Sequence, residues 1–340
     1  MSEAAFPVLG AAFVLLVVLP ISALLTKLVL VLLERGGSAG ALDRLGLRYV
    51  LLTGSSALPL AWFMSAGIHQ AESTRSAFAC LVSHDEAGSC FEPAFFASLL
   101  AGGVLLAWLR ATWQVRQTPV ARSAEGEALS ARLECLVERE SALFRLRGRV
   151  LATEQLDFTL ATGGLLVPRV FVGVGFATKL TDAMLTSGLA HEAQHVGSRD
   201  PLRYLLLQLA LALNPVGRFL LSPHVARWKA AREAHCDREA VLHGAAPLPL
   251  ADAIVRAARP VMSGVAPLGA HDTAVLELRI GLLLAFAERA PVRRQHENHQ
   301  SMPAALALLL AVLLLPHQTG TSPLDVLHTS AERALTYLLF

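Results

Sequence analysis

Charged side chains are scarce in this 340-residue sequence, because Asp, Glu, Lys and Arg together make up only 16% of it. Soluble globular domains carry about 25% charged residues. Hydrophobic residues make up 54% of the chain, so an ordinary soluble enzyme is excluded and much of the surface is expected to face lipid. The net charge is only +2 and no dense run of Lys and Arg stands out, so nucleic acid is not an expected partner.

Cysteine is also rare, and the four that are present are too few for a disulfide-dense scaffold. Cys80 and Cys90 share one short polar segment, whereas Cys135 and Cys236 lie in a long Arg-rich region. A disulfide in this chain would therefore join Cys80 to Cys90, provided that their loop faces an oxidising compartment. Two unpaired thiols are the alternative interpretation.

Long hydrophobic runs take the place of the missing charge. Residues 7–33 are long enough to cross about 30 Å of hydrocarbon. They lack the basic flank of a secretory signal, so we interpret them as a retained anchor. Residues 49–68 and 94–113 predict two more spans, and the shorter run 304–315 predicts either a fourth span or a buried or re-entrant helix. The sequence therefore predicts an integral membrane α-helical protein with about four spans.

The distribution of arginine sets the expected orientation of these spans. Arginines follow the first and third runs and precede the fourth, whereas residues 69–93 and 317–340 carry one arginine each. By the positive-inside rule, the N-terminus and both of these sparse segments lie outside. The expected organisation is a three-span region 1–113 with an outward loop 69–93, a cytoplasmic domain 114–300, a fourth span 301–316 and a short outward tail 317–340.

The cytoplasmic region shows a mixed α+β pattern. Residues 165–174 predict a strand, which Pro168 places at its start or at a sheet edge. Its residues Arg169, Val170, Phe171 and Val172 are candidates for pairing with an extended substrate; a purely structural strand is the alternative. Helices are expected over four segments, 127–147, 182–196 capped by Thr181, 200–214 opened by Asp200-Pro201, and 223–243.

The helix expected over 182–196 carries the pattern His191-Glu192-Ala193-Gln194-His195. Residues four apart lie on one face of a helix, so both imidazoles can reach a single metal ion. Glu192 is then placed to accept a proton from water held by the metal. The pattern also arises by chance, and two polar histidines on a solvated helix face are the alternative interpretation.

A second acidic element further along the chain favours the metal site. Catalytic zinc takes three protein ligands and keeps one position open. Glu233 and Asp237 are four apart on the helix expected over 223–243, so both lie on one face. One can then bind the metal while the other contacts a metal ligand and holds it in place. The apolar segment 202–213, turned at Asn214-Pro215, would fold this helix against the one that carries the histidines.

These elements resemble the BlaR1/MecR1-type membrane metallopeptidases, peptidase family M56. The resemblance covers about residues 1–316, is specific from about 163 to 243, and departs from the family in one respect. After their last span, antibiotic sensors of this type carry an extracellular penicillin-binding domain, but here only residues 317–340 follow, so a β-lactam-sensing role is not expected. The matching segments are His191 to His195, Arg199-Asp200, Asn214-Pro215, Arg232-Glu233 with Cys236-Asp237, the strand 168–172, and Leu278-Arg279-Ile280.

The resemblance implies a gluzincin-type zinc metallopeptidase core. It implies one Zn²⁺ ion held by His191, His195 and Glu233, with Glu192 as the general base and Asp237 orienting a ligating histidine. It further implies an enzyme of a bacterial-type inner membrane, with its catalytic domain in the cytoplasm. The expected partners are the lipid bilayer and a protein or peptide substrate, such as a repressor-type regulator.

Two other functions remain open at this point. The M48 (HtpX/Ste24) group of membrane quality-control proteases shares the HExxH pattern and a downstream ExxxD, although Cys236-Asp237 and the span order favour M56. A non-proteolytic sensor with a structural zinc site is the second alternative. Glu192 argues against it, because a structural site needs no general base. No residue stands out as the donor that stabilises the oxyanion.

Overall fold

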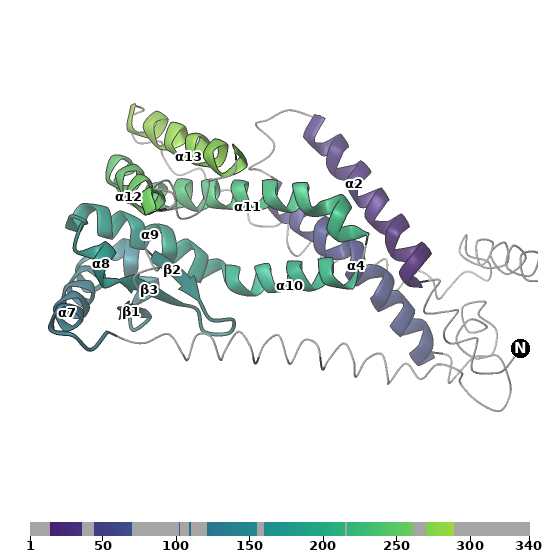
Figure 1. Ribbon diagram of the computed structural model, residues 1–340, viewed down its shortest axis with the longest axis horizontal. Helices are drawn as coiled ribbons and strands as arrows, with labels where there is room; N and C mark the ends of the chain where they lie inside the picture. The colour runs from purple at the N-terminus through teal and green to yellow at the C-terminus, as the bar shows by residue number, and fades with distance from the viewer. Residues whose placement is uncertain are drawn as a thin grey trace, which may run out of the picture. The chain divides into compact units, whose positions relative to one another are not determined.

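The computed structural model describes residues 14–35, 44–69, 102, 109, 121–154, 160–214, 216–260 and 270–288. These residues are mostly helical and include one small mixed sheet (Figure 1). The chain divides into two compact units. The first unit comprises the described parts of 1–105 and 207–226, and the second those of 106–206 and 227–297. The sheet and all the candidate metal ligands belong to the second unit.

The first unit contains an N-terminal helix that is long and apolar enough to cross a membrane. It spans Leu15–Arg35 with a mean hydropathy of 2.6, and consists of a π-helical turn, η1 (Val14–Val18), continued by α2 (Leu19–Arg35). Its side chains Leu24, Leu28 and Leu32 are exposed, so the described residues leave an apolar face of this helix uncovered. Among the described residues no other helix meets this test of length and composition.

Polar side chains tie the helices of the first unit together. α4 (Leu45–His69) packs against α2 and contains the run 49–68 that was expected to span. Asn214 lies between α10 (Asp200–Leu213) and α11 (Gly217–Leu242). Its amide Nδ2 donates to the carbonyl of Leu19 at 2.9 Å, and its Oδ1 accepts from the N–H of Gly217 at 2.7 Å. One side chain thus joins α2 to the start of α11.

Several expectations fall outside the described residues. These are the outward loop with Cys80 and Cys90, almost all of the run 94–113, the run 304–315, and the tail 317–340. The proposed disulfide, the third and fourth spans and the membrane orientation therefore stay predictions. The second span also stays a prediction, because α4 does not meet the test of length and composition for crossing a membrane. Of the remaining cysteines, Cys135 is exposed and Cys236 is buried, and both are free thiols.

The sheet of the second unit has three short strands in the order β1-β3-β2. β3 (Arg169–Gly173) begins directly after Pro168, as the sequence predicted. It pairs in parallel with β1 (Val150–Thr153) and antiparallel with β2 (Leu160–Gly163). Because both edges of β3 are occupied, Arg169, Val170, Phe171 and Val172 cannot pair with a substrate, and that interpretation of the sequence was wrong.

Helices pack on and around this sheet. Of the four expected helices, those over 182–196 and 200–214 begin and end near the predicted residues, whereas α11 begins at Gly217, before the predicted residue 223. α9 (Asp182–Ser198) starts at the cap Thr181, whose side chain accepts from the N–H of Met184, and ends at Arg199 in a left-handed conformation with φ 52°. The helix expected over 127–147 is divided, because Glu140 adopts an extended conformation after α7 (Ala124–Arg139), and a 3-10 helix, η2 (Ser141–Leu146), follows. The remaining helices are α8 (Val174–Ala177), α12 (Pro247–Pro260) and α13 (Ala270–Glu288).

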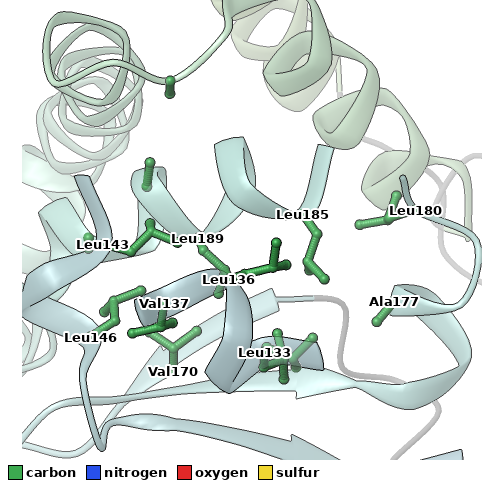
Figure 2. Packing of buried hydrophobic residues seen from close by; sticks show 14 of the residues in the cluster. Leu133, Leu136, Val137, Leu143, Leu146, Val170, Ala177, Leu180, Leu185 and Leu189 are labelled. Carbon is green, nitrogen blue, oxygen red and sulfur yellow. The ribbon is translucent and has the colours of Figure 1, made fainter. Parts of the chain in front are cut away.

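The hydrophobic core of the second unit lies between α9, α7 and the sheet (Figure 2). Leu185 and Leu189 of α9 meet Leu133 and Leu136 of α7 there, and all four are at most 2% exposed. Full burial of a leucine contributes about 1.5–3 kcal/mol, so this contact holds α9 firmly in place. Every residue of α9 from 187 to 196 is buried. The helix that carries the HExxH pattern is therefore fixed on one face by the core, which leaves its opposite face to position functional groups.

Candidate metal centre

His191 and His195 face each other across one turn of α9. Their Nε2 atoms lie 3.1 Å apart, and their rings meet edge to face with centroids 4.8 Å apart. Both residues are 7% exposed. The spacing of four residues thus brings two nitrogen lone pairs toward one point at the edge of the buried region, as expected for residues on one helix face.

Glu233 of α11 completes this group. Its Oε2 lies 3.5 Å from Nε2 of His191, and its Oε1 lies 3.5 Å from Nε2 of His195. These three residues form a set that could hold a metal ion, with all their ligand atoms within 4.8 Å of one another. The structure therefore brings together the three ligands that the sequence singled out. Had the carboxylate of Glu233 pointed away from the imidazoles, a shared metal would have been excluded.

Asp237 supports His191 from the side opposite Glu233. Its Oδ1 lies 2.7 Å from Nδ1 of His191. Arg279 of α13 donates to this carboxylate from Nε at 2.6 Å and from a terminal nitrogen at 2.9 Å, and its other terminal nitrogen lies 3.2 Å from Glu233. Burial by itself would lower the pKa of His191, but the neighbouring carboxylates of Asp237 and Glu233 outweigh it and raise the pKa to about 10.

His195 has a matching support that the sequence did not reveal. Oδ2 of Asp200 lies 2.7 Å from its Nδ1, and Nε of Arg232 donates to the same oxygen at 2.8 Å. Asp200 is fully buried. Burial works to raise the pKa of Asp200, but the contacts with His195 and Arg232 dominate and hold this pKa below its usual value. The Nδ1 atom of each imidazole thus faces a carboxylate, and an arginine donates to each of these carboxylates. These contacts fix the orientation of both rings.

A second group, His195, Asp200 and Cys236, is also compact enough to hold a metal. Its geometry is less suitable, because the Nδ1 of His195 and the carboxylate of Asp200 already face each other. The Cys236 sulfur lies 3.7 Å from that Nδ1, and burial raises the pKa of its thiol well above the usual value. A metal would require the thiolate. The set with Glu233 is therefore the better site.

Glu192 lies beside this set and is positioned by the sheet. The hydroxyl of Thr162 on β2 donates to Oε2 of Glu192 at 2.6 Å. Glu192 is 8% exposed, and it borders the same cavity as His191 and Glu233. The volume of this cavity is about 320 Å³, and Arg279 also contributes to its wall. A carboxylate, a metal-binding set and a space for a ligand thus adjoin one another.

The sequence anticipated part of this site. His191, Glu192, His195, Glu233 and Asp237 come together, whereas the strand residues 169–172 do not border the cavity. Thr162, Arg232 and Arg279 had no assigned role, although Leu278-Arg279-Ile280 matched the resembled family. Asp200 was interpreted as a helix start and as part of the matching segment Arg199-Asp200, without a role at the metal centre. Its position five residues after His195, directly beyond the end of the helix, was the available signal.

Searches against protein-family models, curated proteins and solved structures found no match to this chain. Its function is therefore argued from the geometry and chemistry of the site.

Proposed function

We propose that this chain is a zinc-dependent membrane endopeptidase. The observation that carries the proposal is the convergence of His191, His195 and Glu233, whose facing ligand atoms are 3.1 to 3.5 Å apart. Ligand atoms about 2.0–2.1 Å from a tetrahedral zinc ion lie about 3.3 Å from one another. Two imidazoles and one carboxylate also form the donor set of the His₂Glu class of catalytic zinc sites.

The remaining residues supply the proton chemistry of peptide hydrolysis. When bound, zinc contributes Lewis acidity toward the peptide carbonyl and lowers the pKa of its water to about 7. Glu192 accepts a proton from the attacking water as the new C–O bond forms. It then delivers this proton to the amide nitrogen as the C–N bond breaks, so that a carboxylic acid and an amine are released. Thr162 holds the carboxylate of Glu192 in position for both transfers.

Substrate pairing is assigned to β2 in place of β3. β2 lies at one end of the three-stranded order of the described sheet, so no described strand pairs with its outer edge. Thr162 connects this strand directly to Glu192. An extended peptide added along β2 would form main-chain hydrogen bonds there, a common mode of peptide recognition.

The regulatory role and the membrane setting rest on the sequence. The resemblance to the M56 metallopeptidases supports a signalling protease that cleaves a cytoplasmic regulator, and the apolar helix Leu15–Arg35 supports membrane anchorage. The cavity beside Glu192 favours an enzyme over a sensor with a structural zinc, because a structural site is closed and has no need of a general base. An M48-type quality-control protease would use the same site on other substrates.

The test compares the detergent-purified full chain with two variants, measuring bound zinc and peptide cleavage on the same samples. Glu192→Gln should retain zinc and lose about 10²–10⁴-fold in cleavage rate, the usual contribution of a general base. Glu233→Ala should lose zinc. Glu277→Gln, which alters an exposed glutamate on α13, is the control and should resemble the wild type. Equal cleavage by Glu192→Gln would refute the assigned base. A zinc-loaded wild type that cleaves no peptide would favour the sensor.

A further inference from the structure

The cavity at the metal centre continues into an apolar pocket between α9, α12 and α13. Along α12, the residues that line it are 250, 253, 254, 257 and 258, which repeat at the spacing of a single helix face. Three of these five are alanines, Ala253, Ala257 and Ala258. Because alanine projects so little side chain, this face of α12 leaves open space where larger residues would fill it.

The opposite wall of the pocket is also apolar. α13 contributes Val275 and Leu276, β2 contributes Leu160, and α9 contributes Gly188. Gly188 lies one helical turn before His191 and Glu192. A Cβ built at this glycine would lie 3.4 Å from the side chain of Leu160, so its absence widens the passage between α9 and β2. The space thus opens toward the residues that would carry out the chemistry.

Among the described residues, charge is confined to one end of the cavity. Those of its lining that are ionisable are His191, Glu192, Glu233 and Arg279, all at the metal centre. The other described residues of the wall offer a substrate side chain neither a charge nor a hydrogen-bonding side chain. A charged or polar side chain placed there would lose its hydration without compensation, whereas an apolar one would gain from burial.

We propose that this pocket selects substrates by a large apolar side chain, such as Leu, Met or Phe, next to the scissile bond. The proposal rests on the proposed function and names the substrate class of that site. The whole cavity, its metal-centre end included, has a volume of about 320 Å³, which is at the lower end of the range for small-molecule pockets, about 300–1,000 Å³, and the apolar pocket is a part of it. A pocket of this size takes one side chain and leaves the peptide backbone outside, along β2.

The first experiment uses a series of peptides that differ at one residue beside the cleaved bond, Leu, Phe, Ala or Asp. Wild-type protein should cleave the Leu and Phe peptides at least about tenfold faster than the Ala and Asp peptides, since each buried methylene contributes about 10–200-fold in discrimination. Ala257→Leu, which fills the pocket, should reduce this preference at least about tenfold for Phe with zinc content unchanged. Ala274→Leu, an exposed position on α13 outside the lining, should retain it.

The second experiment does not depend on catalysis. Fluorescent Leu and Asp peptides are titrated into zinc-loaded Glu192→Gln protein, and the Leu peptide should bind at least about tenfold more tightly. If wild-type protein cleaves no peptide, the proposed function fails. The titration alone then shows whether the pocket prefers a large apolar side chain. Equal binding of the two peptides, or no binding of either, would overturn the pocket proposal. So would a preference that Ala257→Leu leaves unchanged.

Discussion

Replacing Asp200 by asparagine should weaken metal binding although Asp200 is not a metal ligand. Its Oδ2 lies 2.7 Å from Nδ1 of His195 and accepts from Arg232 at 2.8 Å. A charged acceptor at Nδ1 keeps the proton on that nitrogen, so the lone pair at Nε2 faces His191 and Glu233. Asparagine has nearly the same shape, but its neutral oxygen holds this tautomer less strongly and no longer balances the charge of Arg232.

The expected magnitude follows from these two contacts. Loss of the carboxylate behind a ligating histidine typically costs about 10–100-fold in metal affinity, which is about 1.4–2.8 kcal/mol at 1.4 kcal/mol for each tenfold. The side chain of Arg232 is 6% exposed, and breaking a buried ion pair costs about 3–5 kcal/mol. The free energy of unfolding of the metal-free protein should therefore fall by up to that amount.

Competition with a chromophoric zinc chelator gives the dissociation constant, and denaturant unfolding in the presence of EDTA gives the stability. Asp252→Asn is the matched control, because Asp252 pairs with Arg256 at 3.2 Å on the surface of α12 with 43% of its side chain exposed. Such surface pairs contribute about 0–1 kcal/mol, so both measurements should stay near wild type. If Asp200→Asn binds zinc as tightly as this control, the carboxylate does not orient His195.

Three further predictions concern His191 and the residues around it. Arg279→Gln removes the hydrogen bonds to Asp237 and the contact with Glu233, so zinc affinity should fall about tenfold or more; Arg279→Lys should recover only part of it, because an ammonium cannot form the paired contact. With its pKa at about 10, metal-free His191 is protonated at neutral pH, so zinc must displace a proton. Apparent zinc affinity should rise about tenfold per pH unit over the neutral range, and calorimetry in two buffers of different ionisation enthalpy should show about one proton released. Because this pKa is raised above its ordinary 6.5, the stability that the charge gives the metal-free protein is complete below pH 6.5 and declines toward about 10. Urea unfolding with EDTA at several pH values checks the sign, and constant stability across that range would contradict it.

Local signals allowed the sequence to predict the helix that carries the histidines and the ligands on it. A cap at Thr181, the spacing of four between His191 and His195, and the same spacing between Glu233 and Asp237 all act within one or two helical turns. The strand after Pro168 was also predicted from a local rule. Its central place in the sheet was not, because this depends on pairing with two four-residue strands whose short sequences give little periodic signal.

The supporting residues could not be assigned for a similar reason. Arg279 reaches Asp237 across 42 positions of sequence, and Arg232 reaches Asp200 across 32. Thr162 lies 30 positions before Glu192. Nothing in the local pattern around these residues specifies such contacts, which exist only once α9, α11, α13 and the sheet have packed together. Asp200 already fitted the local pattern of a helix start, so its contact with His195 was not predicted.

The charges at the site explain why these supports occur in pairs. Asp200 pairs with Arg232, with Arg203 3.6 Å from its other oxygen, and Asp237 pairs with Arg279, so the negative charge behind each imidazole is balanced by arginine. In the described part of the chain, the carboxylates of Glu192 and Glu233 remain on the cavity side, where Arg279, shared with Asp237, contacts Glu233. A divalent cation between the imidazoles would balance both. Without one, protonation of His191 supplies one positive charge at the same place. Asp237 is the main cause that raises the pKa of His191, and Glu233 adds to it. Glu233 thus favours both the protonated histidine of the metal-free protein and a doubly charged ion at the site.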